Sequence, residues 1–344
     1  MKRCIHCATE KDESAFNREH VLNQAFGTFE NNLVLDCKCE DCNQFYGDTV
    51  DLKLARDTIE GFARFQVGTK KPAEFKTYGR NSTTRVEFRE GPLRGAMGHF
   101  IRSPDGTDIG IAPNSYVGFA RTPDEAFEWY PLDALPSKDE LIAKGFRPGP
   151  LRMQTQGNAG IEEIRAALAA KGITGFEITS EEPPLTGRIR TEAVFTITHP
   201  EFRAVTKIAL NYLAAVASPE VVLMPAFDVA RRYARYDERP TPRIVHARVN
   251  PWHFEGPDGR LIRGHYLCVS ALGEEIVAQV CLHTAIRYTV TLARGGVLFP
   301  GSFGHFFDPT TRHALAMASA LPLEPSARQD EDAEQPKTNA EDEP

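Results

Sequence analysis

Cys4-Ile5-His6-Cys7 and Cys39-Glu40-Asp41-Cys42 are the two stretches that decide the fold at the start of this 344-residue chain. Five of the seven cysteines lie in the first 42 residues, whereas Cys268 and Cys281 stand far away in apolar surroundings. Two residues between cysteines allow a tight turn to direct both sulfur atoms at one ion, and two such pairs complete a tetrahedron. Disulfide frameworks are typical of small secreted domains, so the spacing instead predicts a structural zinc site. Its expected ligands are Cys4, Cys7, Cys39 and Cys42.

The segment between the two cysteine pairs carries the residues with catalytic potential. It contains Arg18-Glu19-His20 and Asn31-Asn32-Leu33-Val34-Leu35, and Asn43 directly follows Cys42. Together with a glycine and an aspartate four residues apart, Gly47 and Asp51, this combination resembles the zinc-stabilised subtype of the HNH endonucleases. The resemblance covers roughly the first 55 residues. It implies a ββα-metal finger and a nuclease activity.

The resemblance assigns a role to each residue of the motif. His20 is expected to be the general base, since a neutral imidazole near pH 7 can take a proton from the attacking water. Asn32 is expected to orient His20 by a side-chain hydrogen bond. Glu19 and Asn43 are expected to bind a catalytic Mg²⁺ or Mn²⁺, because hard cations prefer oxygen ligands. Such an ion would stabilise the leaving 3′-oxyanion.

Several alternatives stay open at the level of sequence. Asn43 can be a helix cap rather than a metal ligand. Asn31 and Asn32 cannot be told apart, and either can be a simple turn residue. Cys37 competes with Cys39 for the third zinc position, because the middle asparagine of the family often precedes the cysteine pair by about five residues. Only Cys39 keeps the two-residue spacing to Cys42, so we assign Cys39 to zinc and expect Cys37 to be a small buried residue. His6 lies inside the first cysteine pair and is a candidate ligand, but we expect it to be an exposed loop residue.

The pattern of the whole chain predicts an α+β protein of three parts. The HNH finger is expected over residues 1–66 and an α+β domain with a mainly antiparallel sheet over 67–323, with a subdivision near 150–185 left open. Residues 324–344 are acidic and poor in apolar residues, which predicts a disordered tail. Within the second part we expect a capped helix from Ser137, a helix near 160–171 capped by Asn158, a helix from Pro200 to about Ser218, a helix near 226–236 and a meander over 243–293.

The charge is unevenly distributed along the chain, which bears on the expected partners. Residues 1–60 hold seven basic and twelve acidic residues, an unusual balance for a surface that binds DNA. Residues 61–103 hold nine basic and three acidic residues, and a second basic group is formed by Arg231, Arg232, Arg235, Arg239 and Arg243. Cationic help for DNA binding is therefore expected from these two regions.

The sequence thus predicts a metal-dependent HNH endonuclease that hydrolyses phosphodiester bonds in DNA, with RNA not excluded. A part in phage defence or restriction is what the resemblance suggests. The alternative is a zinc-knuckle module that binds nucleic acid or a protein without catalysis. No run approaches the roughly 18–20 apolar residues of a membrane span, and no apolar signal core follows the first residues, so we expect a cytoplasmic protein. A protein partner or a homodimer is expected to use the C-terminal domain.

Overall fold

The computed structural model describes most of the chain. The described residues are 1–56, 58–71, 74, 84–90, 94–103, 107–122, 125, 127–146, 152–156, 159–174, 190–249, 254–255, 261–262, 264–283, 286–297, 299 and 301–317. The predicted acidic tail, 324–344, lies outside them. Among the described residues, no helix is both long and apolar enough to cross a membrane.

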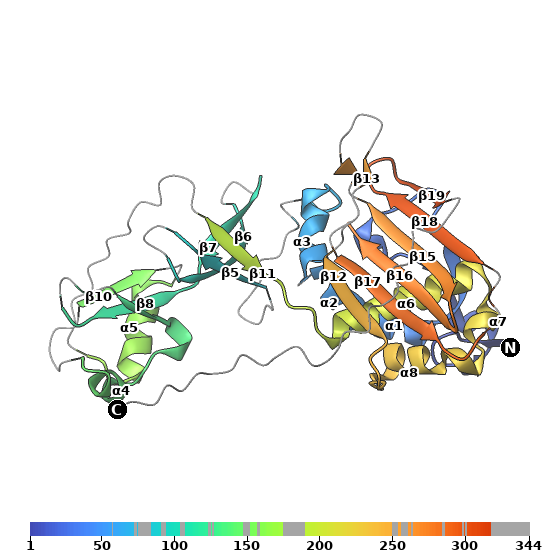
Figure 1. Ribbon diagram of the computed structural model, residues 1–344. Helices are drawn as coiled ribbons and strands as arrows, with labels where there is room; N and C mark the ends of the chain where they lie inside the picture. Colours follow the sequence, from blue (N-terminus) through green and yellow to red (C-terminus); the bar gives the residue numbers. More distant parts are fainter. Residues whose placement is uncertain are drawn as a thin grey trace, which may run out of the picture. The chain divides into compact units, whose positions relative to one another are not determined.

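The chain divides into two compact units, and the first is built from both ends of the sequence. Unit 1 comprises Met1–Asp51 together with Phe202–Pro344, and unit 2 comprises Leu52–Glu201. The sequence places a boundary at residue 66 instead, and the three-part domain organisation stays a prediction. Helices occur beside sheets whose described strand pairs are all antiparallel, which confirms the expected α+β class (Figure 1).

The N-terminal part of unit 1 is a two-stranded ribbon followed by a helix. Its elements are β1 (Lys2–Arg3), β2 (Glu10–Lys11), β3 (Phe16–His20), β4 (Val34–Cys39) and α1 (Glu40–Asp48). Strands β3 and β4 pair antiparallel, with His20 opposite Val34, and a bulge interrupts the ladder between Asn17 and Glu19. The order strand, strand, helix is the ββα arrangement that the resemblance implies.

The C-terminal part of unit 1 is a six-stranded antiparallel sheet with helices. The helices are α6 (His199–Val216), α7 (Pro219–Val222) and α8 (Asp228–Tyr236). The strands are β12 (Val245–Val249), β15 (His265–Leu272), β16 (Glu275–Leu282), β17 (Ile286–Ala293), β18 (Ser302–Asp308) and β19 (His313–Met317), and a separate small hairpin joins β13 (Phe254–Glu255) to β14 (Leu261–Ile262). The sheet order is β12-β17-β16-β15-β18-β19. Strands β15, β16 and β17 form a meander as predicted, whereas β12 breaks the predicted meander because it pairs with β17.

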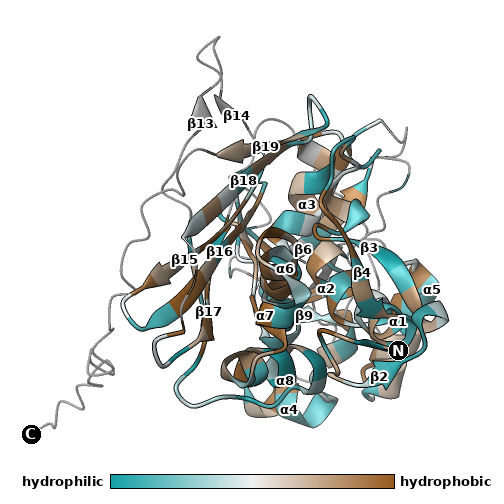
Figure 2. Cartoon of the chain, turned by 90° about the vertical axis from the view of Figure 1, so that its right-hand side faces the viewer, coloured by the Kyte–Doolittle hydropathy of each residue, from teal (hydrophilic) through white to brown (hydrophobic). Residues whose placement is uncertain are grey.

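Helix α6 packs its apolar surface against one face of this sheet. Nearly every residue from Phe202 to Ala214 is buried, and the strands β15, β16 and β17 are strongly apolar (Figure 2). Phe202 lies edge-on to Tyr288 of β17, and the Tyr212 hydroxyl is 2.8 Å from Nδ1 of His305 on β18. The helix therefore lies in the interior of unit 1, where it can contact the N-terminal finger.

Unit 2 contains two small antiparallel sheets and short helices. One sheet has the order β11-β5-β6-β7 and the other β10-β8-β9. Its elements are α2 (Val50–Arg56, which begins in unit 1), α3 (Ile59–Gln66), β5 (Arg85–Phe88), β6 (Met97–Arg102), β7 (Ile109–Pro113), β8 (Tyr116–Ala120), β9 (Glu128–Pro131), α4 (Lys138–Ala143), β10 (Arg152–Gln156), α5 (Ile161–Ala170) and β11 (Thr191–Val194). Phe62 stacks on Phe100, and α4 and α5 pack on β8.

Local signals in the sequence predict some boundaries and miss others. The capping box of Ser137 and Glu140 opens α4 as expected. Helix α5 is capped by Gly160 rather than by Asn158, which lies outside the described residues. The apolar pattern after Cys42 suggests one helix, but Thr49 interrupts it and the chain forms α1, α2 and α3.

Candidate functional site

Four cysteines at the base of the finger form a site that can hold zinc. The sulfur atoms of Cys4, Cys7, Cys39 and Cys42 all lie within 4.8 Å of one another. Those of Cys7 and Cys39 are 3.9 Å apart, close to the roughly 3.8 Å edge of a tetrahedron with zinc–sulfur bonds of about 2.3 Å. The backbone N–H groups of His6 and Cys39 point at the sulfur of Cys4, at 3.5 and 3.4 Å. Donors of this kind stabilise thiolates, so the cluster fits the predicted zinc site.

The third cysteine of the cluster is Cys39 and not Cys37. Cys39 ends β4 and belongs to the cluster, whereas Cys37 is buried elsewhere on the same strand. Burial raises the pKa of the Cys37 thiol to about 11, so this residue stays protonated. Cys37 is therefore the small buried residue that the spacing suggests.

Helix α8 brings cationic side chains to the zinc site. The Arg235 guanidinium interacts electrostatically with Cys42 and stacks on Phe45, 3.9 Å from the ring centre. Arg231, also on α8, is buried and pairs with Asp228, and the Nε atoms of both arginines have no partner among the described residues. Zinc with four thiolates carries a charge of about −2, and these arginines would balance it.

His6 is not the exposed residue that the sequence suggests, because it lies in the core between the finger and α6. The Tyr46 hydroxyl donates to His6 Nδ1 at 3.1 Å, and His6 Nε2 donates to the side-chain oxygen of Asn211 at 2.8 Å. Burial lowers the pKa of His6 well below its usual value, and nearby Lys38 adds to this effect. A neutral His6 links both ends of the chain and does not bind the ion.

His20 and Asn32 meet at the end of the ribbon where a loop joins β3 to β4. Nδ2 of Asn32 lies 3.2 Å from Nδ1 of His20, and Oδ1 of Asn32 is buried without a partner among the described residues. With Nδ2 facing the ring, the neutral imidazole carries its proton on Nε2 and offers no free lone pair to water. A half-turn of the amide lets Oδ1 accept from Nδ1–H, which leaves Nε2 as a base. The contact supports a base in this second orientation.

The loop that carries Asn32 is tied to the C-terminal sheet. The side chain of Asn31 donates to the carbonyl of Ala314 at 2.6 Å and accepts from its N–H at 2.7 Å. Nε2 of His265 lies 2.9 Å from the carbonyl oxygen of Phe26. The two adjacent asparagines therefore have different contacts. Asn31 anchors the loop to β19, and Asn32 contacts His20.

Glu19 lies in a buried network of charged groups. Its Oε1 accepts hydrogen bonds from Nζ of Lys38 at 2.7 Å and from Nζ of Lys207 at 3.2 Å. Lys207 also donates to Asp51 at 2.9 Å. Burial works to raise the pKa of Glu19, but the two lysines prevail and hold it below its usual range. Glu19 is therefore a carboxylate whose charge is already balanced.

Sequence reasoning did not find the two lysines of this network. Lys207 follows Val205 and Thr206 on the apolar surface of α6 and is fully buried. A charged residue within an otherwise buried helix face is the signal that could have indicated it, because a buried ammonium needs a carboxylate partner. Lys38 lies between Cys37 and Cys39, where the cysteine spacing indicates zinc but gives no sign of a buried ammonium group.

The residues assigned to the catalytic ion fit it by donor type. Glu19 supplies a carboxylate, and Asn43 is half-buried inside α1, three residues past its first residue. Cys39 is the N-cap of that helix, so Asn43 is not a cap. No hydrogen bond joins Asn43 to Glu19 among the described residues, and the cysteine cluster is the one group of three or more Cys, His, Asp or Glu there that can hold a metal. Mg²⁺ needs only one or two protein oxygens and completes its shell with water and phosphate.

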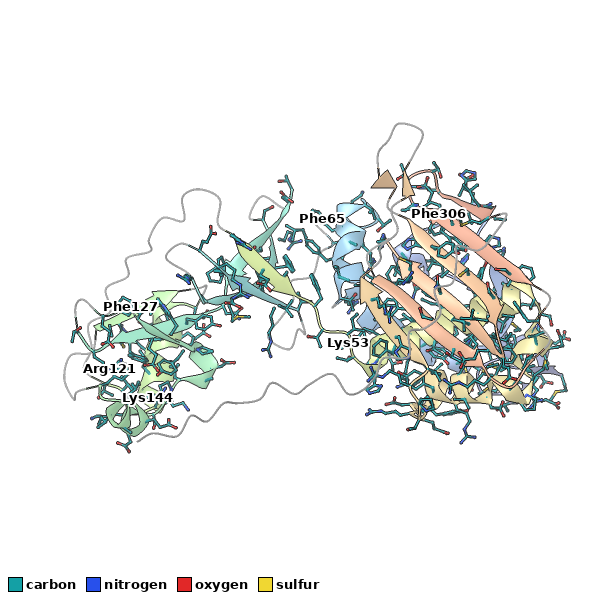
Figure 3. All side chains as sticks on the ribbon, in the orientation of Figure 1. Lys53, Phe65, Arg121, Phe127, Lys144 and Phe306 are labelled. Atoms are coloured by element: carbon teal, nitrogen blue, oxygen red, sulfur yellow. The ribbon has the colours of Figure 1, made fainter. Side chains whose placement is uncertain are left out.

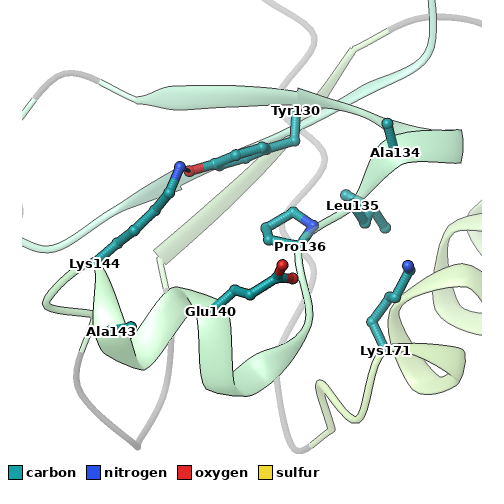
Figure 4. Close-up of a pocket in the computed structure, with 8 residues that line it drawn as sticks. All are labelled: Tyr130, Ala134, Leu135, Pro136, Glu140, Ala143, Lys144 and Lys171. Carbon is teal, nitrogen blue, oxygen red and sulfur yellow. Dashed lines mark hydrogen bonds between the residues drawn. The ribbon is translucent and has the colours of Figure 1, made fainter.

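A hollow in unit 2 offers no comparable chemistry. It has a volume of about 520 Å³ and is lined by residues around α4 that include Tyr130, Glu140, Lys144 and Lys171 (Figure 4). Lys144 donates to the hydroxyl of Tyr130 and to Glu128, and Arg121 nearby bonds the Lys144 carbonyl (Figure 3). These polar groups stabilise one another, and none of the predicted site residues lies here.

The comparisons with known proteins identify one part of the chain. Residues 4–59 match the model of a family described as HNH endonuclease. The match includes the four cysteines and the segment from Glu19 to Asn43, and it ends before α6 and the six-stranded sheet. The comparisons with curated proteins and with solved structures give no match.

Proposed function

We propose that this chain, with an HNH endonuclease domain over residues 4–59, is a metal-dependent endonuclease that hydrolyses phosphodiester bonds in DNA. The observation that carries the proposal is the contact between His20 and Asn32, 3.2 Å apart, on a ββα finger closed by four cysteines. A zinc knuckle that only binds nucleic acid needs no oriented histidine. RNA stays open as a second substrate.

His20 acts as the general base in this proposal. Its ring lies at the end of β3 and is half-exposed, so water and substrate can reach it. Asn32 holds Nδ1–H, which fixes the tautomer and directs the Nε2 lone pair outward. A base placed in this way typically contributes a factor of about 10²–10⁴ to the rate.

Glu19 and Asn43 would hold the Mg²⁺ or Mn²⁺ ion, which would neutralise the phosphate and stabilise the leaving oxyanion. Arg18 is exposed on β3 next to Glu19 and is the basic residue nearest to His20 in the sequence. We assign it to a non-bridging oxygen of the phosphate. The zinc site would serve only to hold α1 and β4 together.

The basic residues of the C-terminal region are a poor source of DNA-binding surface. Arg232 pairs with Glu238 at 2.6 Å and Arg239 approaches Asp237 at 3.5 Å, while Arg235 faces the zinc site. Residues 61–103 hold nine basic and three acidic residues, so we propose that this segment contacts the DNA backbone, with Arg89 excepted because it pairs with Glu87 and Glu192. Restriction or phage defence in the cytoplasm is the role that such an activity would serve.

One other candidate is a module that binds a protein or nucleic acid without cutting it. It is favoured by the acidic composition of the finger and by the internal pairing of these arginines.

The experiment incubates zinc-loaded protein with supercoiled plasmid, single-stranded DNA and RNA, each with Mg²⁺, Mn²⁺ or a chelator. Metal-dependent cleavage of DNA supports the proposal. Binding without cleavage under every condition would favour the non-catalytic module.

A further inference from the structure

Lys207 connects the nuclease finger to the C-terminal half of the chain through a buried ion-pair network. It lies on α6, 156 residues after Asp51, and none of its side chain is exposed. Its ammonium group lies between two carboxylates of the finger, 3.2 Å from Oε1 of Glu19 and 2.9 Å from Oδ2 of Asp51. The matched family model ends at residue 59, so this contact comes from outside the HNH domain.

The network is balanced in charge and reaches solvent chiefly at Glu19, since the Asp51 side chain is only 6% exposed. Lys38 and Lys207 supply two positive charges, and Glu19 and Asp51 supply two negative ones. The lysine side chains are fully buried, whereas Glu19 keeps 16% of its side-chain surface exposed. Both hydrogen bonds to Glu19 end on Oε1, which leaves Oε2 as the oxygen that can meet a ligand.

We propose that Lys207 is a positioning residue of the nuclease site, which holds Glu19 by Oε1 and keeps the free protein's affinity for a divalent cation low. The inference rests on the proposed function, because Glu19 is the carboxylate assigned there to the ion. A cation that binds Oε2 meets the ammonium of Lys207 on the other oxygen of the same carboxylate, and like charges repel strongly where water is excluded. Approach of a negatively charged phosphate would offset this repulsion.

The test measures Mn²⁺ binding to the full-length, zinc-loaded protein at pH 7 by electron paramagnetic resonance, without nucleic acid. Lys207→Met keeps the apolar stem and removes the charge, and we expect it to bind Mn²⁺ roughly tenfold or more tightly than the wild type. Lys2→Met is the matched control, because it removes the same charge from the finger at a residue that pairs with Asp36 instead. We expect the control to bind Mn²⁺ as the wild type does.

A second variant keeps the proposal open to refutation if Lys207→Met does not fold. Lys207→Gln retains a hydrogen-bond donor without the charge and should show the same gain. In either background, adding Glu19→Gln should abolish the gain. Unchanged Mn²⁺ affinity in a folded Lys207 variant, or a gain that survives Glu19→Gln, would overturn the proposal. Because no cleavage is measured, an inactive protein would count against the proposed function and leave this result interpretable.

Discussion

Acid should loosen the loop that joins β3 to β4, because a neutral histidine of the C-terminal sheet holds that loop. Nε2 of His265 donates to the carbonyl oxygen of Phe26 at 2.9 Å, and its Nδ1 accepts from the backbone N–H of His283 at 3.1 Å. The neutral ring satisfies both contacts, whereas a second proton on Nδ1 would face another N–H. Burial lowers the pKa of His265 to about 4.

The size of the effect follows from the difference in proton binding between the two states. An unfolded histidine has a pKa of about 6.5, so the unfolded chain takes up a proton at higher pH than the folded chain does. The contribution of His265 to the free energy of unfolding is fully present above a pH of about 6.5. It is lost as the pH falls from there toward 4, by about 1.4 kcal/mol per pH unit. Between pH 7.5 and 5.0 the loss amounts to about 2 kcal/mol of unfolding free energy.

Urea unfolding at pH 7.5 and pH 5.0 measures this loss directly. His265→Gln can still donate to the Phe26 carbonyl but does not titrate, so its stability should fall by about 2 kcal/mol less than that of the wild type between the two pH values. The reasoning is refuted if His265→Gln and the wild type lose equal stability on acidification.

Three further predictions concern the zinc site and the loop. Cys39→Ser should lose bound zinc and with it the folded finger, whereas Cys37→Ser should retain about one zinc ion per chain in metal analysis; equal zinc content would contradict the assigned register. Arg235→Gln should lose zinc to a chelator about tenfold faster than Arg232→Gln, which changes the same charge on the same helix; equal rates would show that α8 does not stabilise the site. Asn31→Ala removes both hydrogen bonds to β19, so the free energy of unfolding should fall by about 1–3 kcal/mol and the loop amides should exchange faster. Unchanged exchange would mean that the anchor lies elsewhere.

The zinc site could be predicted from the sequence because its information is local. Two cysteine pairs, each with a two-residue spacing, are typical of a zinc site, and the finger that carries them lies within 50 residues. The contact of His20 with Asn32 is equally local, because the pairing of β3 with β4 brings the ends of their connecting loop together. The choice between Asn31 and Asn32 depended on Ala314, which no local pattern could indicate.

The charged network and the division into units could not be predicted in the same way. Lys207 reaches Glu19 only because α6 returns to the finger after a whole intervening unit, and nothing near Glu19 in the sequence indicates that partner. The burial of His6 depends on distant contacts in the same way, since Asn211 and Tyr46 cover it from two other elements. Polar residues on an apolar helix such as α6 therefore carry more information about long-range contacts than their number suggests.

The cleavage rate of a labelled DNA duplex, compared between the wild type and His20→Ala at equal zinc content, tests the central claim most directly. The account predicts a loss of about 10²–10⁴-fold in the variant, with folding and DNA binding unchanged, because the general base alone is removed. His246→Ala, at an exposed residue of β12 on the opposite edge of the sheet from β19, should cut at the wild-type rate. Equal metal-dependent cleavage by wild type and His20→Ala would contradict the claim that His20 is the base of an HNH nuclease.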